Sequence, residues 1–281
     1  MPDLIDAAAP WSVAELLDAA QRGAYGADPA ALFASGAMWI RQSTQFPGAA
    51  QKYRNHYLVL RCGAAFGACC VERDDLPSEV AEDLAGASLA ALLDDPRLPV
   101  RIAALDAYLG TVRPHRSAPQ AAPWQLPAGT PPERALARDR AIVSLLKIEP
   151  GQNVALIGVV NPLVQAIRER GGTCLPCDFN LRVTQWGDPV SAAMEPVLES
   201  ADLVIATGMT LGNGSFDRIL ARVRERGVPL VVYAQTGSSI VPQFLGRGVS
   251  AVSAEPFPFS QFSAEPSVLY RYRLDSALAQ E

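Results

Sequence analysis

The sequence predicts an α/β protein in which a parallel sheet covered by helices follows a smaller α+β unit. Three observations support this fold class. Helical segments alternate with short apolar strands from about residue 133 onwards, the region before residue 112 lacks this alternation, and a proline-rich segment separates the two. Alternation of this kind indicates right-handed crossovers and a parallel sheet buried on both faces. The C-terminal unit is therefore predicted to be Rossmann-like.

The first unit, residues 1–112, is predicted to combine helices with one hairpin. Ser12 and Glu15 form a capping-box pattern, which marks the start of a helix. Two strand-like runs separated by two residues indicate a hairpin. The expected elements are a helix from Ser12 to about Gly23, strands 56–62 and 65–71, and helices at about 78–94 and 99–110.

Residues 113–132 are predicted to be a linker. Six of the nineteen residues from Pro114 to Pro132 are proline, and proline is excluded from helix interiors and central strands. We expect this segment to run over the surface. The second unit, residues 133–281, then contains a helix at about 133–147, a helix from Pro162, and strands at about 154–158, 174–177, 203–207, 230–234 and 249–252.

Composition excludes several classes of function. The net charge of −5 gives no electrostatic surface for nucleic acid. No apolar run approaches the roughly 18 to 20 residues that span a bilayer, and the N-terminus has no signal-peptide pattern. Five cysteines are an odd number and few for this length, so a secreted disulfide framework is not indicated. We expect a cytoplasmic protein whose partner is a small molecule, with neither nucleic acid nor membrane bound.

Three loops carry the candidate ligand-binding residues. In an open parallel sheet, ligands bind at the carboxyl ends of the strands, which here lead into loops 159–162, 208–215 and 235–239. These loops offer hydroxyl, amide and backbone N–H groups and contain no Lys, Arg, His or Cys, a pattern that suits hydrogen-bonded recognition of a polar molecule. The alternative interpretation is that they are caps and turn formers. The candidates are Asn161, Thr207, Gly208, Thr210, Asn213, Gly214, Gln235, Thr236 and Ser238.

Cofactor and metal motifs are weak in this sequence. The loop after Gly158 lacks the further glycines of a dinucleotide site. Asp178 follows the second strand, where an acidic residue often meets a ribose, so an enzyme using an adenine cofactor such as S-adenosylmethionine is an alternative, although its glycine-rich loop is also missing. Cys174 and Cys177 are expected to lie on a strand with diverging sulfurs, and no zinc-ligand spacing is present.

Four segments resemble a known family in order and spacing. They are ALIGVVNPLVQAIRERGG, the later Asp178-Phe-Asn180, ESADLVIATGMTLGNGSFDRIL and VVYAQTGSSIVPQFLGRGVSAV. Together they resemble the Rossmann-like domain family labelled putative heavy-metal chelation, whose members carry a Thr-Gly-x-Thr-Leu-x-Asn-Gly-Thr/Ser segment. The segment RIAALDAYLG, residues 101–110, also resembles a helix of the enolase-N-terminal-like domain that precedes the Rossmann-like domain in this family.

This resemblance implies an enolase-N-terminal-like first domain and a site in the cleft between the two domains. It adds Asn180 to the candidate binding residues and places Asp106 in the cleft as the catalytic acid or base. Asp106 stands where the family commonly has Asn, and Gln235-Thr236 replaces the usual Gly-Pro, so the ligand is expected to differ from that of its relatives. A non-catalytic carrier of a metal or chelate is a further alternative, with any metal held through a chelating ligand. A homodimer is also expected. Segment 255–262 is unlike a helix and suggests a lid or a dimer contact.

Overall fold

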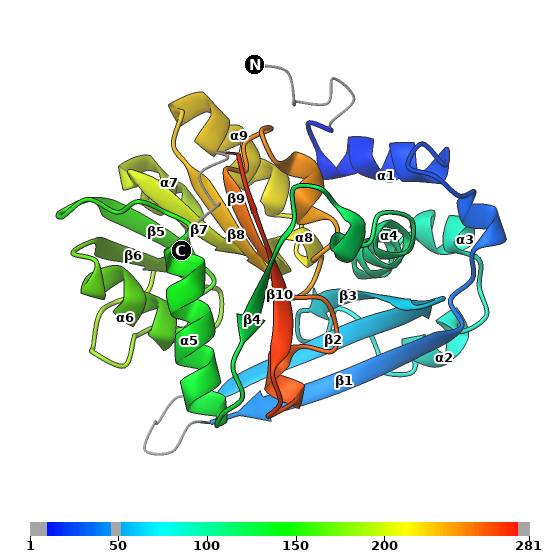
Figure 1. Cartoon of the computed structure of the whole chain (residues 1–281), viewed down its shortest axis with the longest axis horizontal. Helices are drawn as coiled ribbons and strands as arrows, with labels where there is room; N and C mark the ends of the chain where they lie inside the picture. The colour runs from blue at the N-terminus through cyan, green and yellow to red at the C-terminus, as the bar shows by residue number, and fades with distance from the viewer. Residues whose placement is uncertain (1–9, 46–51, 275–281) are drawn as a thin grey trace.

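The computed structural model describes residues 10–45 and 52–274 and places them in two β-sheets. The smaller sheet has the strand order β1-β2-β3, and the larger has the order β4-β10-β9-β8-β7-β5-β6. Figure 1 shows the smaller sheet with α2, α3 and α4 on one side of the molecule and the larger sheet with α5, α6 and α7 on the other. The predicted fold class is confirmed, with the parallel strands in the C-terminal half.

The first unit contains an antiparallel sheet with α4 packed across it. The hairpin predicted from the sequence is formed by β2 and β3, and Gly63 at its turn has a φ of 56°. The single helix expected at 78–94 is instead two short helices, because Gly86 adopts a φ of 86° between them. The elements are α1 Val13–Gln21, η1 Pro29–Ala31, β1 Gly36–Thr44, β2 Tyr53–Cys62, β3 Ala65–Val71, α2 Val80–Leu84, α3 Leu89–Leu93 and α4 Leu98–Val112.

The second unit is built on five parallel strands, to which two antiparallel strands add at one edge. Its elements are η2 His115–Ser117, β4 Ala122–Leu126, α5 Pro131–Val143, β5 Asn153–Ile157, α6 Asn161–Glu169, β6 Thr173–Cys177, α7 Met194–Ser200, β7 Leu203–Thr207, α8 Met209–Gly212, α9 Phe216–Arg226, β8 Leu230–Ala234, η3 Val241–Phe244, β9 Ala251–Ala254, η4 Ser260–Phe262 and β10 Ser267–Arg273.

The predicted linker is part of the large sheet. Strand β4 lies within it and pairs with β10, with Trp124 opposite Leu269. Pro123 is tolerated because β4 is an edge strand, where a missing N–H leaves no ladder bond unmade. The linker therefore connects the two units and also closes one edge of the sheet, which differs from the surface path expected from its composition.

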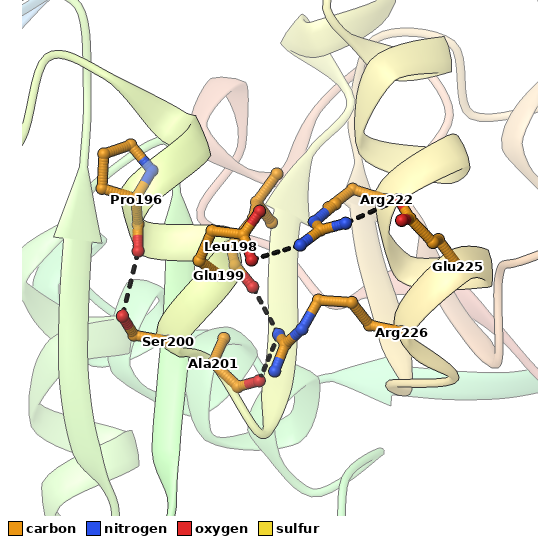
Figure 2. Close-up of polar contacts among 8 residues, drawn as sticks. All are labelled: Pro196, Leu198, Glu199, Ser200, Ala201, Arg222, Glu225 and Arg226. Atoms are coloured by element: carbon orange, nitrogen blue, oxygen red, sulfur yellow. Dashed lines mark hydrogen bonds and ion pairs between the residues drawn. The ribbon is translucent and has the colours of Figure 1, made fainter.

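Helices cover both faces of the parallel sheet. Val154 and Leu156 of β5 belong to the core on the face covered by α5 and α6, whereas Ala155 and Ile157 belong to the core on the opposite face. On that opposite face, two arginines of α9 join it to α7 (Figure 2). Arg222 pairs with Glu199 of α7 and also with Glu225 of α9 itself. Arg226 donates to backbone carbonyls at the end of α7.

One hydrophobic core is shared between the two units. The cluster that contains Leu58 of β2 and Tyr108 of α4 also contains Phe216, Val232 and Phe244 of the second unit. Burial of apolar surface is the main favourable contribution to folding, so this shared core stabilises the arrangement of both units. The boundary near residue 112 is consequently a packed interface.

Segment 255–262 covers the second face of the small sheet. Phe259 is fully buried against Tyr57, with ring centroids 5.3 Å apart, and Phe257 lies 5.2 Å from Phe66. The sequence suggested a lid or a dimer contact here, but in the structure these aromatic rings form an internal cluster. The small sheet is thereby sandwiched between α4 and a segment from the C-terminal part of the chain.

Candidate functional site

The segment from Thr207 to Ser215 leads from β7 into α9 and contains the short helix α8, where the sequence suggested an extended binding loop. Its hydroxyl and amide groups are bonded within the segment. The Thr210 hydroxyl donates to the Thr207 carbonyl at 2.7 Å, and Asn213 Oδ1 accepts from both the N–H and the hydroxyl of Ser215. The interpretation of these residues as caps and turn formers therefore accounts for the contacts of Thr210 and Asn213.

Two glycines of this segment allow close approach of protein backbone. A Cβ on Gly208 would lie 2.3 Å from the Thr236 carbonyl oxygen, and a Cβ on Gly212 would lie 2.6 Å from the Cys70 carbonyl oxygen. Both distances are far below a van der Waals contact, so only glycine fits. The space that the sequence assigned to a ligand at Gly208 is filled by the 235–239 loop. Gly214, with a φ of 75°, ends the turn before α9.

Asp106 joins three elements from the centre of α4. It is 1% exposed, and its two carboxylate oxygens accept the backbone N–H groups of Ala68, at 2.9 Å, and Ser239, at 2.7 Å. Desolvation by burial raises its pKa to about 7, although these backbone donors oppose the shift. The sequence placed Asp106 in an open cleft. In the structure it is enclosed, and it fixes the 235–239 loop against β3.

Asp178 organises the loops after β5 and β6. Its Oδ2 accepts the N–H of Val159 at 2.8 Å, and its Oδ1 accepts those of Asn180 at 2.7 Å and Leu181 at 3.0 Å. These bonds engage both oxygens that the adenine-cofactor alternative assigns to a ribose. The exposed Asn180 side chain reaches the first unit, where it donates to Glu72 at 3.4 Å.

Asn161 lies at the junction between the units. It is the first residue of α6, which begins one residue before the Pro162 expected from the sequence, and it is 6% exposed. Its Nδ2 donates to the hydroxyl of Tyr53 on β2 at 3.1 Å, and its Oδ1 accepts the N–H of Gln185 at 3.1 Å. Burial raises the pKa of Tyr53, so this phenol stays protonated. One predicted residue thus contacts both the first unit and the loop after β6.

A second polar cluster crosses the same junction through Gln235. Its Nε2 donates to Gln261 Oε1 at 2.6 Å, and Gln261 Nε2 in turn donates to Gln42 Oε1 at 3.2 Å. The Tyr57 hydroxyl also donates to Gln42 Oε1, at 3.2 Å. The nearby Thr236 is 3% exposed. Ser238 is fully buried, and its hydroxyl has no hydrogen-bond partner among the described residues.

Charged residues missed in the sequence lie beside these clusters. On α5, Arg138 Nε donates to Asp139 Oδ1 at 2.8 Å, with the Asp139 side chain fully buried and that of Arg138 17% exposed. Burial raises the pKa of Asp139, the Arg138 guanidinium opposes this rise, and the negative charge of Glu255, after β9, adds to it. Burial also raises the pKa of the part-buried Tyr233. The charge of Asp139 adds to this rise, and that of Arg138 opposes it. Arg138 and Asp139 were hard to identify from the sequence, because polar residues within an amphipathic helix ordinarily indicate its solvated face.

The predicted residues divide into two groups. Asn161 and Gln235 lie in polar clusters that contain side chains from both units, and Asn180 also bridges the units. Asp106, Asp178, Thr210 and Asn213 instead have backbone or neighbouring partners. A surface hollow of about 230 Å³, lined by Val228, Pro229 and Val249, lies at the amino ends of β8 and β9, the opposite end of the strands from these residues.

Metal-ligating side chains do not cluster among the described residues. Within 10–45 and 52–274, no group of three or more His, Cys, Asp or Glu side chains lies close enough to hold a metal ion. Burial raises the pKa of Cys70 to about 12, which keeps this thiol protonated at neutral pH, whereas metals bind the thiolate.

No helix in the described part of the chain has the length and apolar character of a membrane span.

Comparisons with known proteins address the family and the fold. Residues 141–254 match the DUF364 family, described as "Putative heavy-metal chelation". A DUF364 protein of unknown function from Desulfitobacterium hafniense DCB-2 has a similar structure, with a TM-score of 0.56, 16% identity, and coverage of 85% of this chain and 84% of that chain. One from Pyrococcus horikoshii has a TM-score of 0.54, 15% identity, and coverage of 91% and 98%.

No curated protein matches the sequence significantly. At these identities the solved structures show the shared fold alone. The enolase-N-terminal-like character of the first unit stays a prediction from the sequence. Over residues 141–254, about two fifths of its length, the chain is similar to the DUF364 family.

Proposed function

We propose that this protein binds a small polar or metal-chelating molecule at the junction between the units. The binding region is formed by Asn161 and Gln235 at the carboxyl edge of the large sheet and by Gln42, Tyr53 and Tyr57 of the small sheet. The observation that carries the proposal is the chain of amide and phenol contacts from Gln235 through Gln261 to Gln42. These groups both donate and accept hydrogen bonds, and they converge where open parallel sheets bind ligands.

The metal named in the family description fits this region only as part of a chelate. The donors are amide and phenol groups, and burial raises the pKa values of Tyr53 and Tyr57, which keeps both phenols neutral. Neutral amides and phenols are poor ligands for a soft heavy metal, which prefers thiolate or imidazole. We therefore propose that the protein recognises the organic molecule, which in turn carries any metal. Both a carrier and an enzyme acting on the molecule are compatible with this recognition.

Native mass spectrometry with elemental analysis tests the proposal on the protein as purified. We expect a small molecule, alone or with a metal, to be retained at up to one equivalent by the wild-type chain. Gln261→Ala interrupts the amide chain and is expected to lower the retained fraction. Gln165→Ala is the matched control, because among the described residues this side chain bonds only to Glu169, on the outer surface of α6.

The proposed region would be refuted if Gln261→Ala and Asn161→Ala both retained the small molecule as fully as wild type. The molecule would then bind elsewhere. An empty wild-type protein leads to a thermal-shift screen of small chelators and adenine cofactors. If no chelator raised Tm while an adenine cofactor did, the adenine alternative would replace the proposal.

A further inference from the structure

Arg138 has an unusual hydrogen-bonding arrangement for a largely buried arginine. Its Nε donates to the adjacent Asp139, but neither terminal guanidinium nitrogen donates to any residue within 10–45 or 52–274. Arg134, one turn earlier on the same helix, uses its terminal nitrogens on the Pro127 carbonyl and the Ser267 hydroxyl. Arg226 also donates its Nη1 to backbone carbonyls (Figure 2). Arg134 and Arg226 act as structural arginines, whereas the terminal donors of Arg138 remain available.

The surroundings of Arg138 belong to the junction described above. Burial raises the pKa of Tyr57, in the small sheet, and of Tyr233, near the end of β8. The positive charge of Arg138 lowers both pKa values and so partly offsets the rise. Its charge also interacts with Glu255, after β9. With a side chain 17% exposed, Arg138 is accessible to a small solute. A guanidinium fork at this position presents parallel N–H donors that match a planar oxyanion.

We propose that Arg138 anchors a carboxylate group of the ligand through its terminal nitrogens, an inference that rests on the proposed function. Asp139 is the positioning residue, because its Oδ1 holds Nε and so fixes the plane of the guanidinium. The ligand class is thereby narrowed to carboxylate-bearing chelators. A phosphate dianion is disfavoured, because it places two negative charges beside Asp139 and Glu255, where Arg138 supplies one positive charge.

Asp139 has an unmade hydrogen bond of its own beside the guanidinium. Its side chain is fully buried, and its Oδ2 has no hydrogen-bond partner among the described residues. An unpaired buried carboxylate oxygen is costly, because it has lost its water without gaining a hydrogen bond. Such a cost is common where a functional group must be held in place. Arg138 and Asp139 together thus provide a donor fork and an adjacent acceptor at the junction.

Isothermal titration calorimetry of the full chain tests the anchor with three probes. Picolinate is a planar, metal-chelating monocarboxylate, picolinamide has nearly the same shape without the charge, and inorganic phosphate represents the other oxyanion class. We expect wild type to bind picolinate at least about tenfold more tightly than picolinamide or phosphate, as charge-assisted bonds to arginine would give. In Arg138→Lys, which lacks the fork, the preference over picolinamide should fall by about tenfold.

Two further variants separate binding from folding. Arg138→Gln with Asp139→Asn removes both charges and avoids an unpaired buried carboxylate, so it should fold and lose the preference for picolinate over picolinamide. Arg218→Gln is the matched control, since Arg218 pairs with Glu195 on the opposite, α7–α9 side of the sheet and should leave picolinate binding unchanged. Circular dichroism of each variant establishes that it is folded.

Several results would overturn the anchor. These are equal binding of picolinate and picolinamide to wild type, no picolinate binding up to about 20 mM, tighter binding of phosphate than picolinate, or wild-type binding by the folded double variant. Failure of the anchor remains distinct from failure of the proposed function. A molecule retained by wild type and lost from Gln261→Ala would uphold the junction as a binding site even if Arg138 proved irrelevant.

Discussion

Asp106 and Ser239 lie 133 positions apart in the chain, yet the Ser239 N–H donates to the Asp106 carboxylate at 2.7 Å in a fully buried contact. The same carboxylate accepts the Ala68 N–H, so one side chain joins α4, β3 and the loop after β8. This loop contains Gln235 and Thr236, which belong to the candidate site. Asp106 thus positions part of the junction even though it is enclosed by protein.

Replacing Asp106 by alanine should destabilise the protein markedly. The backbone N–H groups of Ala68 and Ser239 would both lose their acceptor in the interior, at about 1 to 3 kcal/mol each. We expect Asp106→Ala to lower the free energy of unfolding by about 2 to 5 kcal/mol at pH 5.5, measured by urea denaturation. A loss below about 0.5 kcal/mol would show that water or a backbone shift satisfies both donors.

The pH dependence of stability should carry the signature of Asp106. Burial raises its pKa to about 7 from the ordinary value of 3.8, so the folded state binds this proton more tightly than the unfolded state. The stability contributed by the protonated form is present below about pH 4 and is lost as the pH rises through 7. The full loss is about 4 kcal/mol, at about 1.4 kcal/mol per pKa unit.

Asp106→Asn removes this titration and serves as the reference. The free energy of unfolding of wild type minus that of Asp106→Asn should fall between pH 4.5 and 7.5, by up to about 4 kcal/mol. A difference that stays constant across this range would mean that Asp106 titrates normally. The comparison also tests the consequence of an acid at a position where the family resemblance implies Asn.

Gly212 should not tolerate a side chain. A Cβ there would lie 2.6 Å from both the Cys69 sulfur and the Cys70 carbonyl oxygen, which would force α8 away from β3. We expect Gly212→Ala to lose about 1 to 3 kcal/mol in thermal or chemical denaturation. Gly36→Ala is the control, because its Cβ would meet Arg61 Cβ at an ordinary 3.9 Å. Equal stability of the two variants would contradict the close packing of α8.

Phe259 should contribute strongly to stability through the aromatic cluster on the small sheet. Its side chain is fully buried and contacts the rings of Tyr57 and Phe257. Phe259→Ala is expected to lose about 3 to 5 kcal/mol. Phe262, which is 42% exposed in the same segment, should lose far less when replaced by alanine. Similar losses for the two variants, or no loss for Phe259→Ala, would mean that the segment detaches readily.

Periodicity predicted the regular part of the fold and missed the strands that depend on distant partners. The parallel strands have buried, nearly continuous apolar runs, such as Leu203–Thr207, and these are recognisable locally. Strand β1 was missed because its residues are only half-buried at a sheet edge. Strand β4 was excluded by its prolines, and its pairing with β10 joins segments more than 140 residues apart. No local pattern encodes such a pairing.

The candidate site was predictable only in part. The rule that ligands meet strand carboxyl ends located Asn161 and Gln235, and the structure joins both to side chains of other elements. Glycine-rich composition could not distinguish room for a ligand from room for backbone, which is how Gly208 is used. Arg138 and Asp139 could not be found, because burial of a polar helix face depends on the packing around it.

Strand β4 enters the large sheet only through β10, which lies between β4 and β9. Residues 122–126 are therefore synthesised long before residues 267–273, with which they pair, whereas β9 precedes β10 by only a short segment. Pairings so distant along the chain are slow to form, and unpaired strand edges promote association between nascent chains. Completion of this sheet is thus deferred until residues 267–273 have been synthesised, which makes the large sheet dependent on β10 and sensitive to termination of the chain before it.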